Sequence, residues 1–389
     1  MTPTRTGLLL LGLTLGVCIT NGFARFAYGL ILPAMRADLG WTYAQAGWIN
    51  TANALGYIAG ALLTLALVRH VSAARLFQAG MLTTTAFLLA TGLTHDFWAL
   101  TLWRILTGIG GAMAFIAGGA LAAALHPDDK HRNALAIAIY YGVGGGLGMV
   151  LSGAVLPTLF ARTAPSIWPS AWLLMAAASL LFLPLCLWAA QRLRPPTQSK
   201  QSPVATPLAP MLFQILGYLG FGLGYIVYVT FLVAWMKTGF DTPLLISAVW
   251  ITMGLGIMAS PFVWRRVLAR FSSGLPLALI LLTMATGALL PLALPSTLGL
   301  LSSAALFGIS VFMAPSAVTS FCRLNLPPAA WGRAVSLFTV VFAVGQTIGP
   351  VAAGLIGDAS GNIGVSLLCG GAILALGAAL ALLQKPLPR

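Results

Sequence analysis

Acidic residues are scarce in this chain of 389 residues. It contains no glutamate, and all six of its acidic residues are aspartates. Charged residues of both signs make up 7% of the chain, whereas a soluble domain carries about 25%. Because 59% of the residues are hydrophobic and the mean hydropathy is +0.96, we expect lipid rather than water around most of the surface. The few carboxylates also limit the groups that could carry protons or bind cations within a membrane.

Signals for metals, disulfides, nucleic acids and catalysis are missing too. The four cysteines lie in apolar segments without CxxC spacing, and the four histidines lie at segment ends, so no disulfide framework, metal or other cofactor is expected. The basic residues are dispersed rather than gathered on a face with aromatics, so nucleic acid is not an expected partner. No nucleophile–base pair falls within an apolar segment, and no loop is long enough for a receptor's sensing domain. We therefore expect neither an enzyme nor a receptor.

What the chain does contain is a series of apolar segments, each long enough to cross a bilayer. A bilayer core of about 30 Å needs about 20 mostly apolar residues per helix. The pattern predicts an all-α membrane protein with twelve transmembrane helices in two related six-helix halves. The expected spans are 6–32, 44–68, 75–94, 97–124, 133–160 and 170–190, followed by 209–234, 243–264, 274–294, 297–321, 332–357 and 362–383.

A polar, Pro- and Ser-rich stretch divides the twelve spans into two sets. It covers residues 191–210 and includes RLRPPTQSKQSPVATP, which is the composition of a linker. We therefore expect an N-terminal half at 1–190, a cytoplasmic linker at 191–210 and a C-terminal half at 211–389.

The two halves repeat one another in sequence. At an offset of about 200 residues, the following residues recur in order: Gly22, Tyr28 and Gly56 as Gly222, Tyr228 and Gly256, and then Pro127, Arg132, Gly144, Gly148 and Gly153 as Pro328, Arg333, Gly345, Gly349 and Gly354. Internal repeats of this kind are typical of secondary transporters, which bind substrate near the bilayer midplane between the repeats.

The basic residues predict the orientation of the chain. Most of the 20 Lys and Arg residues lie on the side that would hold both termini, and only Arg36, Arg162 and Lys237 lie on the other side. Because loops rich in Lys and Arg stay in the cytoplasm, both termini are expected there. The first apolar segment is too long for the core of a signal peptide, so we interpret it as a retained helix.

Motifs in the fourth and eleventh spans carry a resemblance to a known family. The fourth span contains the series Leu100, Arg104, Thr107, Gly108, Gly110, Gly111 and Ala112, and the eleventh contains Gly345, Gly349, Pro350, Ala353 and Gly354. The chain thereby resembles the major facilitator superfamily over essentially its whole length. The second motif is associated with antiporters, but in that family it usually sits in the fifth helix.

The first span resembles one bacterial branch of that superfamily. Residues 21–28 read NGFARFAY and are followed by LPAM at 32–35. The resemblance implies a multi-pass protein of the bacterial inner membrane. It also implies a monomer.

Arg25 is the most informative single residue. It lies about 10 Å of helix away from the end of its span, too deep for easy snorkelling, and an arginine stays protonated. Asn21, Arg25 and Tyr28 share one face of the helix. Arg104 lies at a similar depth in the fourth span, and no acidic residue is expected at this level. Two buried cations without a counter-ion suggest that an anionic substrate supplies one; the alternative partners are backbone carbonyls or Asp38 and Asp96 at helix ends.

Further candidates come from the repeat and from polar side chains within spans. Tyr225 is the symmetry partner of Arg25, with Tyr228 on the same stripe. A tyrosine hydroxyl in an apolar bundle needs a partner, which a substrate oxygen could be, although aromatic packing explains such residues as well. Asn53 in the second span and Gln346 in the eleventh complete the candidate substrate-binding set, and inter-helix hydrogen bonding is the alternative for Asn53.

The residues favour a secondary transporter for a small organic anion, expected to be a carboxylate, that works by alternating access. No ATP-binding motif is present, so a gradient must supply the energy, and an ion could be co-transported or exchanged. The alternatives are an efflux pump for apolar or cationic drugs and a sugar transporter of the same fold. Cation capture usually needs a buried carboxylate, which this chain does not offer. Import and export, and symport, antiport and uniport, all remain compatible with these residues.

Overall fold

Long helices make up almost all of the structure, a computed structural model that describes residues 3–162, 164–193 and 209–387. The first half contains α1 (Pro3–Val17), η1 (Cys18–Phe26), α2 (Tyr28–Leu39), α3 (Tyr43–Leu67), α4 (Ala73–Thr91), α5 (Phe97–Ala122), α6 (Lys130–Ala138), η2 (Ile139–Val143), α7 (Gly144–Ala161), η3 (Pro165–Ile167) and α8 (Trp168–Gln191). The second contains η4 (Ala209–Met211), α9 (Leu212–Met236), α10 (Pro243–Arg270), α11 (Leu275–Ala293), α12 (Thr297–Val311), α13 (Ala314–Asn325), α14 (Pro328–Ser360) and α15 (Ile363–Leu382).

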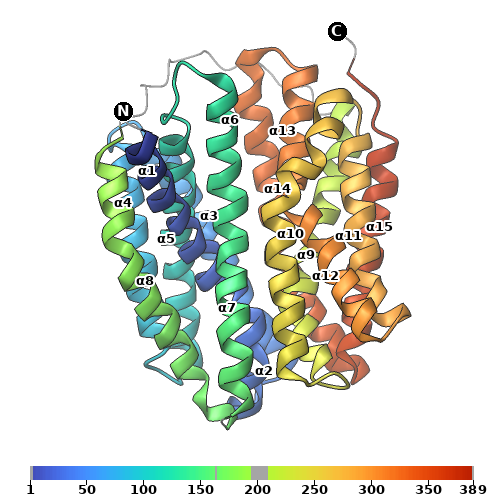
Figure 1. Cartoon of the computed structure of the whole chain (residues 1–389). Coiled ribbons are helices and arrows are strands. Elements are labelled where there is room, and N and C mark those ends of the chain that lie inside the picture. Colours follow the sequence, from blue (N-terminus) through green and yellow to red (C-terminus); the bar gives the residue numbers. More distant parts are fainter. Residues whose placement is uncertain (1–2, 163, 194–208, 388–389) are drawn as a thin grey trace.

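The helices form two bundles that stand side by side (Figure 1). In each bundle, the described residues make six helical rods. The elements α1, η1 and α2 run on as one rod, as do α6, η2 and α7, and α13 follows α12 after a two-residue break. Eleven of the rods are long and apolar enough to cross a membrane. The remaining rod, α4, is less apolar and packs between α5 and α8. The expected all-α, twelve-helix fold of two related halves is thus confirmed. Residues 194–208, which hold most of the expected linker, lie outside the described residues.

The first and tenth expected spans differ in detail from the structure. The first rod continues beyond residue 32 to Leu39, with Pro33 inside α2, and ends at Gly40, whose φ of 64° is left-handed and suits glycine. The tenth rod breaks between α12 and α13 at Phe312 and Met313, just before Pro315 in the first turn of α13. The break is accompanied by a change in polarity, because α13 contains an arginine and an asparagine, which α12 lacks.

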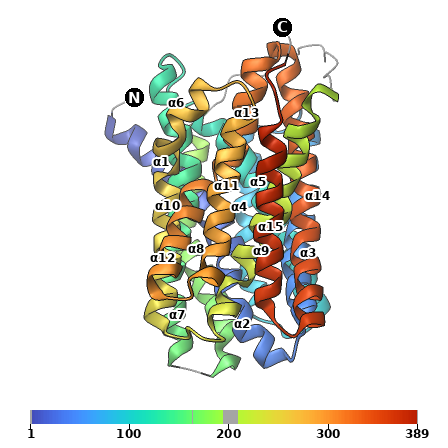
Figure 2. The same cartoon turned by 90° about the vertical axis from the view of Figure 1, so that its right-hand side faces the viewer.

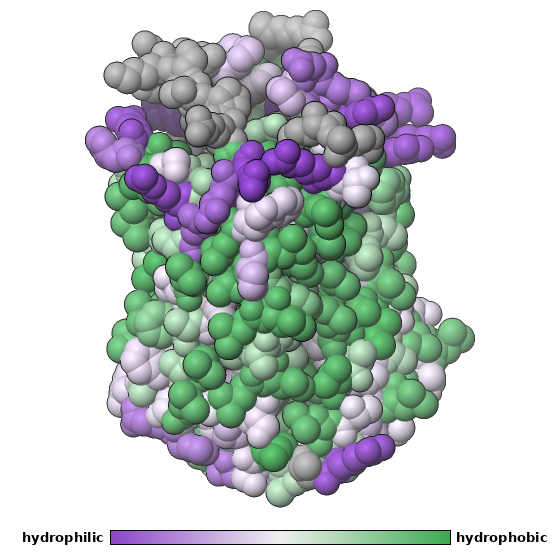
Figure 3. Space-filling view, turned by 60° about the vertical axis from the view of Figure 1, so that its left-hand side comes forward, coloured by the Kyte–Doolittle hydropathy of each residue, from purple (hydrophilic) through white to green (hydrophobic). Residues whose placement is uncertain are grey.

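The two ends of the bundle differ in polarity. We call the end where α1 begins and α15 ends the near end, and the end where α2 gives way to α3 the far end; Figure 2 shows both from the side. Figure 3 shows a broad apolar belt with hydrophilic residues above and below it, and these are most abundant at the near end. The exposed basic residues at near-end helix termini include Arg69, Arg75, Arg132, Arg265, Arg266, Arg323 and Arg333. The belt matches the lipid surroundings that the composition predicts.

Helices α3 and α14 hold the two halves together toward the far end. Gly47 lies against the carbonyl of Pro350, and Gly354 lies against the carbonyl of Tyr43, so closely that a Cβ atom at either glycine would clash with backbone. The Thr51 hydroxyl donates to the carbonyl of Thr347 at 2.7 Å. The small side chains therefore let two long helices of opposite halves meet backbone to backbone.

Asp358, near the end of α14, caps the first turn of α3. Its Oδ1 and Oδ2 atoms accept hydrogen bonds from the backbone N–H groups of Tyr43 and Ala44, both at 2.8 Å. A helix N-terminus has unpaired N–H groups and a partial positive charge, and both favour a carboxylate. Asp358 thus joins the halves by a charged contact at the far end.

A cavity of about 280 Å³ lies between the halves at the same far end. Leu30 and Phe160 line it from the first half, and Val233 and Pro243 line it from the second. Residues of this cavity are expected to become accessible when the halves part at the far end.

We predict that Asp358→Asn loosens the far end. Asparagine keeps one acceptor but loses the charge, and a carboxylate at a helix N-terminus contributes about 1 kcal/mol, which corresponds to about a fivefold rise in the open fraction. The measurement is the labelling rate of Val233→Cys by a maleimide in detergent, with Cys369 replaced by serine. Asp96→Asn is the control, because Asp96 caps α5 within its own half. Equal labelling rates with and without Asp358→Asn would contradict the prediction.

Candidate functional site

Arg25 lies in a π-helical stretch of the first rod. This stretch, η1, separates α1 from α2 and closes with the hydrogen bond from the N–H of Ala27 to the carbonyl of Gly22 at 2.9 Å. Gly22 packs directly against Gly148 of α7, and a side chain at either position would meet the other's backbone. π-Helical turns occur often at functional sites because they rotate the residues that follow relative to a regular α-helix. The stretch thereby sets the direction of the Arg25 side chain.

The guanidinium of Arg25 reaches across to the other half. Its Nη2 atom donates to the hydroxyl of Tyr225 in α9 at 2.6 Å and to the Oε1 atom of Gln346 in α14. The Tyr225 hydroxyl also donates to the same Oε1 atom at 3.1 Å. On the side of the first half, the guanidinium lies 5.3 Å from the ring centroid of Tyr57. The exposed fraction of Arg25 is 7%, so this charge is held between the halves and away from solvent.

No carboxylate balances the charge of Arg25 among the described residues. The ion pairs of the described chain are Asp129 with Arg132 and Asp241 with Lys237. Asp38 accepts from the indole N–H of Trp168 at 2.8 Å, and Asp96 caps α5. The remaining partners of Arg25 are neutral oxygens and an aromatic ring, which favour a cation less than a carboxylate does.

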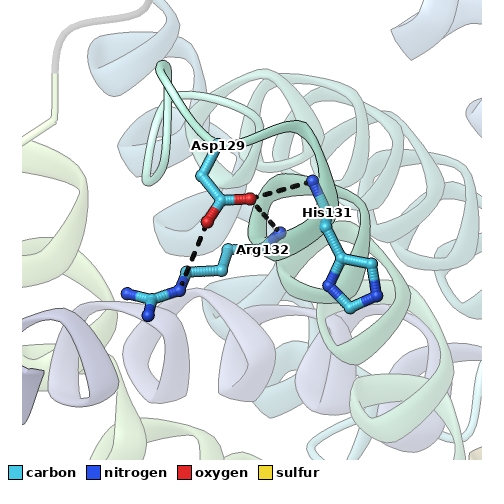
Figure 4. A network of polar contacts seen from close by, with 3 residues as sticks. All are labelled: Asp129, His131 and Arg132. Carbon is cyan, nitrogen blue, oxygen red and sulfur yellow. Dashed lines mark hydrogen bonds and ion pairs between the residues drawn. The ribbon is translucent and has the colours of Figure 1, made fainter.

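Asp129, at the near end, bonds to the first turn of α6 (Figure 4). Its carboxylate caps α6 by accepting from the N–H groups of Arg132 and His131, both at 3.0 Å. These hydrogen bonds, led by that of Arg132, and the nearby Arg132 guanidinium hold the pKa of Asp129 below its usual value. The side chain is therefore ionised at neutral pH and acts as a helix cap.

Arg104 is fully buried and has different partners from Arg25. Its Nη1 atom donates to the carbonyl of Ala24, the residue before Arg25, at 2.6 Å. Its guanidinium carbon lies 5.0 Å from the ring centroid of Trp172 and 5.5 Å from that of Tyr28. These partners all belong to the first half. In the structure, Arg104 holds the backbone beside Arg25 and does not itself reach the other half.

The structure brings some of the candidate residues together and separates others. Arg25, Tyr225 and Gln346 form one hydrogen-bonded cluster. Tyr28 donates to the carbonyl of Ala46 at 2.7 Å, Asn53 donates to the carbonyl of Arg104 at 3.2 Å, and Tyr228 shares a hydrogen bond of 2.6 Å with Ser303. Asn21 is buried, and its Nδ2 atom has no partner among the described residues.

Phe342 and Phe115 are the part of the site that the sequence reasoning did not identify. Phe342 stacks on Tyr225 with a centroid distance of 5.5 Å, and Phe115 lies 6.3 Å from Tyr57. A signal for Phe342 was available: it precedes Gln346 by four residues and so lies on the same face of α14. The repeat offset of 201 also pairs Phe342 with Tyr141, whose ring centroid lies 4.6 Å from that of Phe115.

The site offers donors and rings but no cluster of metal ligands. Within the described residues, no three His, Cys, Asp or Glu side chains come close enough to share a metal ion. The arrangement can hold an anion against the Arg25 guanidinium, with the Tyr225 hydroxyl and the Gln346 amide as further hydrogen-bonding groups.

Comparisons with known proteins agree with this fold. The model of a family described as "Uncharacterised MFS-type transporter YbfB" matches residues 17–382. A Haemophilus influenzae protein described as a metabolite transport protein is 30% identical over 139 residues, which cover 36% of this chain and 33% of that protein. The MFS-type transporter YcaD of Escherichia fergusonii is 29% identical over 178 residues, covering 46% of this chain and 43% of that one. The alignments thus span less than half of each relative.

Solved structures extend the likeness to the whole chain. A bacterial homologue of the human lysosomal transporter Spinster, in an inward-facing and unoccupied conformation, has a TM-score of 0.71 at 15% identity, with 99% of this chain and 98% of that chain covered. A variant of the nucleoside transporter NupG has a TM-score of 0.71 at 13% identity, with 97% and 100% covered. At this identity, the likeness shows the fold alone.

We predict that Arg104→Met destabilises the first half. The change removes the hydrogen bond to the Ala24 carbonyl and the contacts with the Tyr28 and Trp172 rings, and a hydrogen bond to a charged group contributes about 1.5–3 kcal/mol. Thermal unfolding in detergent should therefore occur at a lower temperature.

The matched control is Arg69→Met, because Arg69 is exposed at the near end. Arg104→Lys should fall between wild type and Arg104→Met, since lysine keeps the charge but lacks the planar fork. An unchanged or higher unfolding temperature for Arg104→Met would mean that burial of the charge costs more than these contacts contribute.

Proposed function

Because this chain belongs to the family of MFS-type transporters, we propose that it is a secondary transporter that carries a small organic anion, a carboxylate, across the bacterial inner membrane. The observation that supports this substrate class is the Arg25 guanidinium, buried between the halves with only neutral partners. A buried charge is costly unless it is paired. A carboxylate substrate supplies the missing charge and fits the planar guanidinium through two parallel hydrogen bonds.

The position of Arg25 suits alternating access. Arg25 belongs to the first half, whereas Tyr225 and Gln346 belong to the second, so one ligand at this point contacts both halves. A ligand that binds both halves can favour the state in which they are closed around it, by its difference in affinity for the two states. Because the whole path lies within one chain, we expect a monomer to be sufficient.

The polarity of the two ends supports a cytoplasmic near end. Exposed basic residues gather at the near-end termini of α3, α10, α13 and α14, whereas the exposed basic residues of the far end include Arg162 and Lys237 (Figure 3). Juxtamembrane Lys and Arg stay on the cytoplasmic side. Both ends of the chain then face the cytoplasm.

A role in cation efflux receives less support from the site. The described carboxylates lie in loops or at helix termini, and those of Asp38, Asp96, Asp129, Asp241 and Asp358 bond to backbone, tryptophan, arginine or lysine partners. Arg25 itself repels a cation. A co-transported proton would have to arrive on the substrate as the undissociated acid, or transport proceeds by exchange against another anion.

The test is ligand-induced stabilisation of the purified protein and of Arg25→Gln. Small carboxylates should raise the unfolding temperature of wild type, since a ligand at a hundred times its Kd adds about 2.7 kcal/mol. Loss of the charged partner from a buried contact costs at least about 2 kcal/mol, so affinity should fall by about thirtyfold or more in Arg25→Gln.

Arg162→Gln is the matched control, because Arg162 is exposed at the far end. Transport itself is tested with sealed vesicles that contain no other protein. A carboxylate that stabilises the protein is radiolabelled, and its uptake into these vesicles would show transport. Stabilisation by sugars or organic cations that persists in Arg25→Gln would contradict the anion proposal and favour a sugar transporter or a drug efflux pump.

A further inference from the structure

Aromatic rings surround the Arg25 guanidinium in both halves. In the second half, Phe221, Tyr225 and Phe342 stack on one another, with centroid distances of 4.8–5.5 Å and interplanar angles of 18–24°. The Tyr225 ring of this stack carries the hydroxyl that binds Arg25. These three rings of the second half are therefore nearly parallel to one another.

The first half presents a second group of rings to the same guanidinium. Tyr57 lies beneath it at 5.3 Å, Phe115 lies 6.3 Å from Tyr57, and Tyr141 lies 4.6 Å from Phe115. We call the two groups together the aromatic collar; it comprises Tyr57, Phe115, Tyr141, Phe221, Tyr225 and Phe342. Four of its members, Tyr57, Phe115, Tyr141 and Phe342, are only half-buried.

The collar extends from Arg25 toward the near end. Phe221 precedes Tyr225 in α9, and Phe342 precedes Gln346 in α14, and both helices run from the near end to the far end. Within the described residues, the hydrogen bonds between the halves lie at the level of Arg25 or farther toward the far end. A ligand that enters from the near end therefore meets the collar before it meets Arg25.

We propose that the transported anion is an aromatic carboxylate, an inference that rests on the proposed function. Its carboxylate binds Arg25 in place of the Tyr225 hydroxyl and the Gln346 amide oxygen, and its ring lies among the rings of the collar. The three nearly parallel rings of the second half accept a flat aromatic body in the offset-stacked geometry that aromatic pairs prefer, and the inclined rings of the first half, at 61° and 53° to one another, can meet its edge. Apolar burial alone does not select for flatness, because it depends on the buried area.

The experiment compares benzoate with cyclohexanecarboxylate, which has the same charge and ring size but a puckered and more apolar ring. Affinities come from the ligand dependence of the unfolding temperature at neutral pH, where both are anions. We expect benzoate to bind wild type about tenfold more tightly, although apolar burial alone would favour the cyclohexane ring. Both affinities should depend on Arg25.

The decisive variant is Phe342→Leu, which removes one ring of the stack and leaves Arg25, Tyr225 and Gln346 in place. It should reduce the preference for benzoate by about threefold to tenfold, whereas Phe342→Trp should retain it. Phe262→Leu is the matched control, because Phe262 is 53% exposed on α10, outside the collar. Unfolding temperatures without ligand show whether each variant is folded.

Two results would overturn the inference, and they are distinguishable. If both carboxylates bind equally well and both are lost in Arg25→Gln, the transporter carries organic anions without selecting an aromatic body. If neither carboxylate binds, the anion proposal fails and the aromatic proposal fails with it.

Discussion

The arrangement of this protein depends on one buried positive charge that has no carboxylate beside it. Arg25 lies between two apolar bundles, and its partners there are the Tyr225 hydroxyl, the Gln346 amide oxygen and the Tyr57 ring. Neutral dipoles compensate a guanidinium only in part, and this is the basis of the proposal that the substrate is an anion. The contacts with Tyr225 and Gln346 also join the two halves, so in the proposed mechanism binding of an anion and separation of the halves are coupled through one side chain.

The remaining contacts between the halves make the two ends unequal. At the far end, glycines let α3 and α14 meet backbone to backbone, and Asp358 adds a charged cap on α3. Toward the near end from Arg25, the described residues form no hydrogen bond between the halves, and the contacts there include aromatic rings and the close approach of α7 and α10 at Gly146 and Gly254. Apolar contacts are less directional than hydrogen bonds and separate without leaving unpaired buried groups.

Much of this could be predicted from the order of the residues. Apolar segments of about twenty residues locate the helices because a bilayer core leaves few other ways to satisfy the backbone. The repeat offset of 200 residues pairs Arg25 with Tyr225, and the structure places these two side chains 2.6 Å apart. Gln346, which the sequence also offers as a candidate, belongs to the same cluster. Tyr28 and Tyr228 share stripes with these residues along the sequence but bond elsewhere.

The sequence by itself determined the lipid surroundings, the helical class and the two halves, because each of these follows from composition and spacing. It also determined the scarcity of carboxylates that leaves the charge of Arg25 without an acidic partner. Only the tertiary structure decided which polar side chains meet. The π-helical stretch rotates Arg25 toward the second half, and Arg104 fixes the backbone beside it, although a regular helix would place Arg25 and Tyr28 on one stripe. Such choices depend on how helices far apart in the chain pack together, and hydropathy carries no information about that packing.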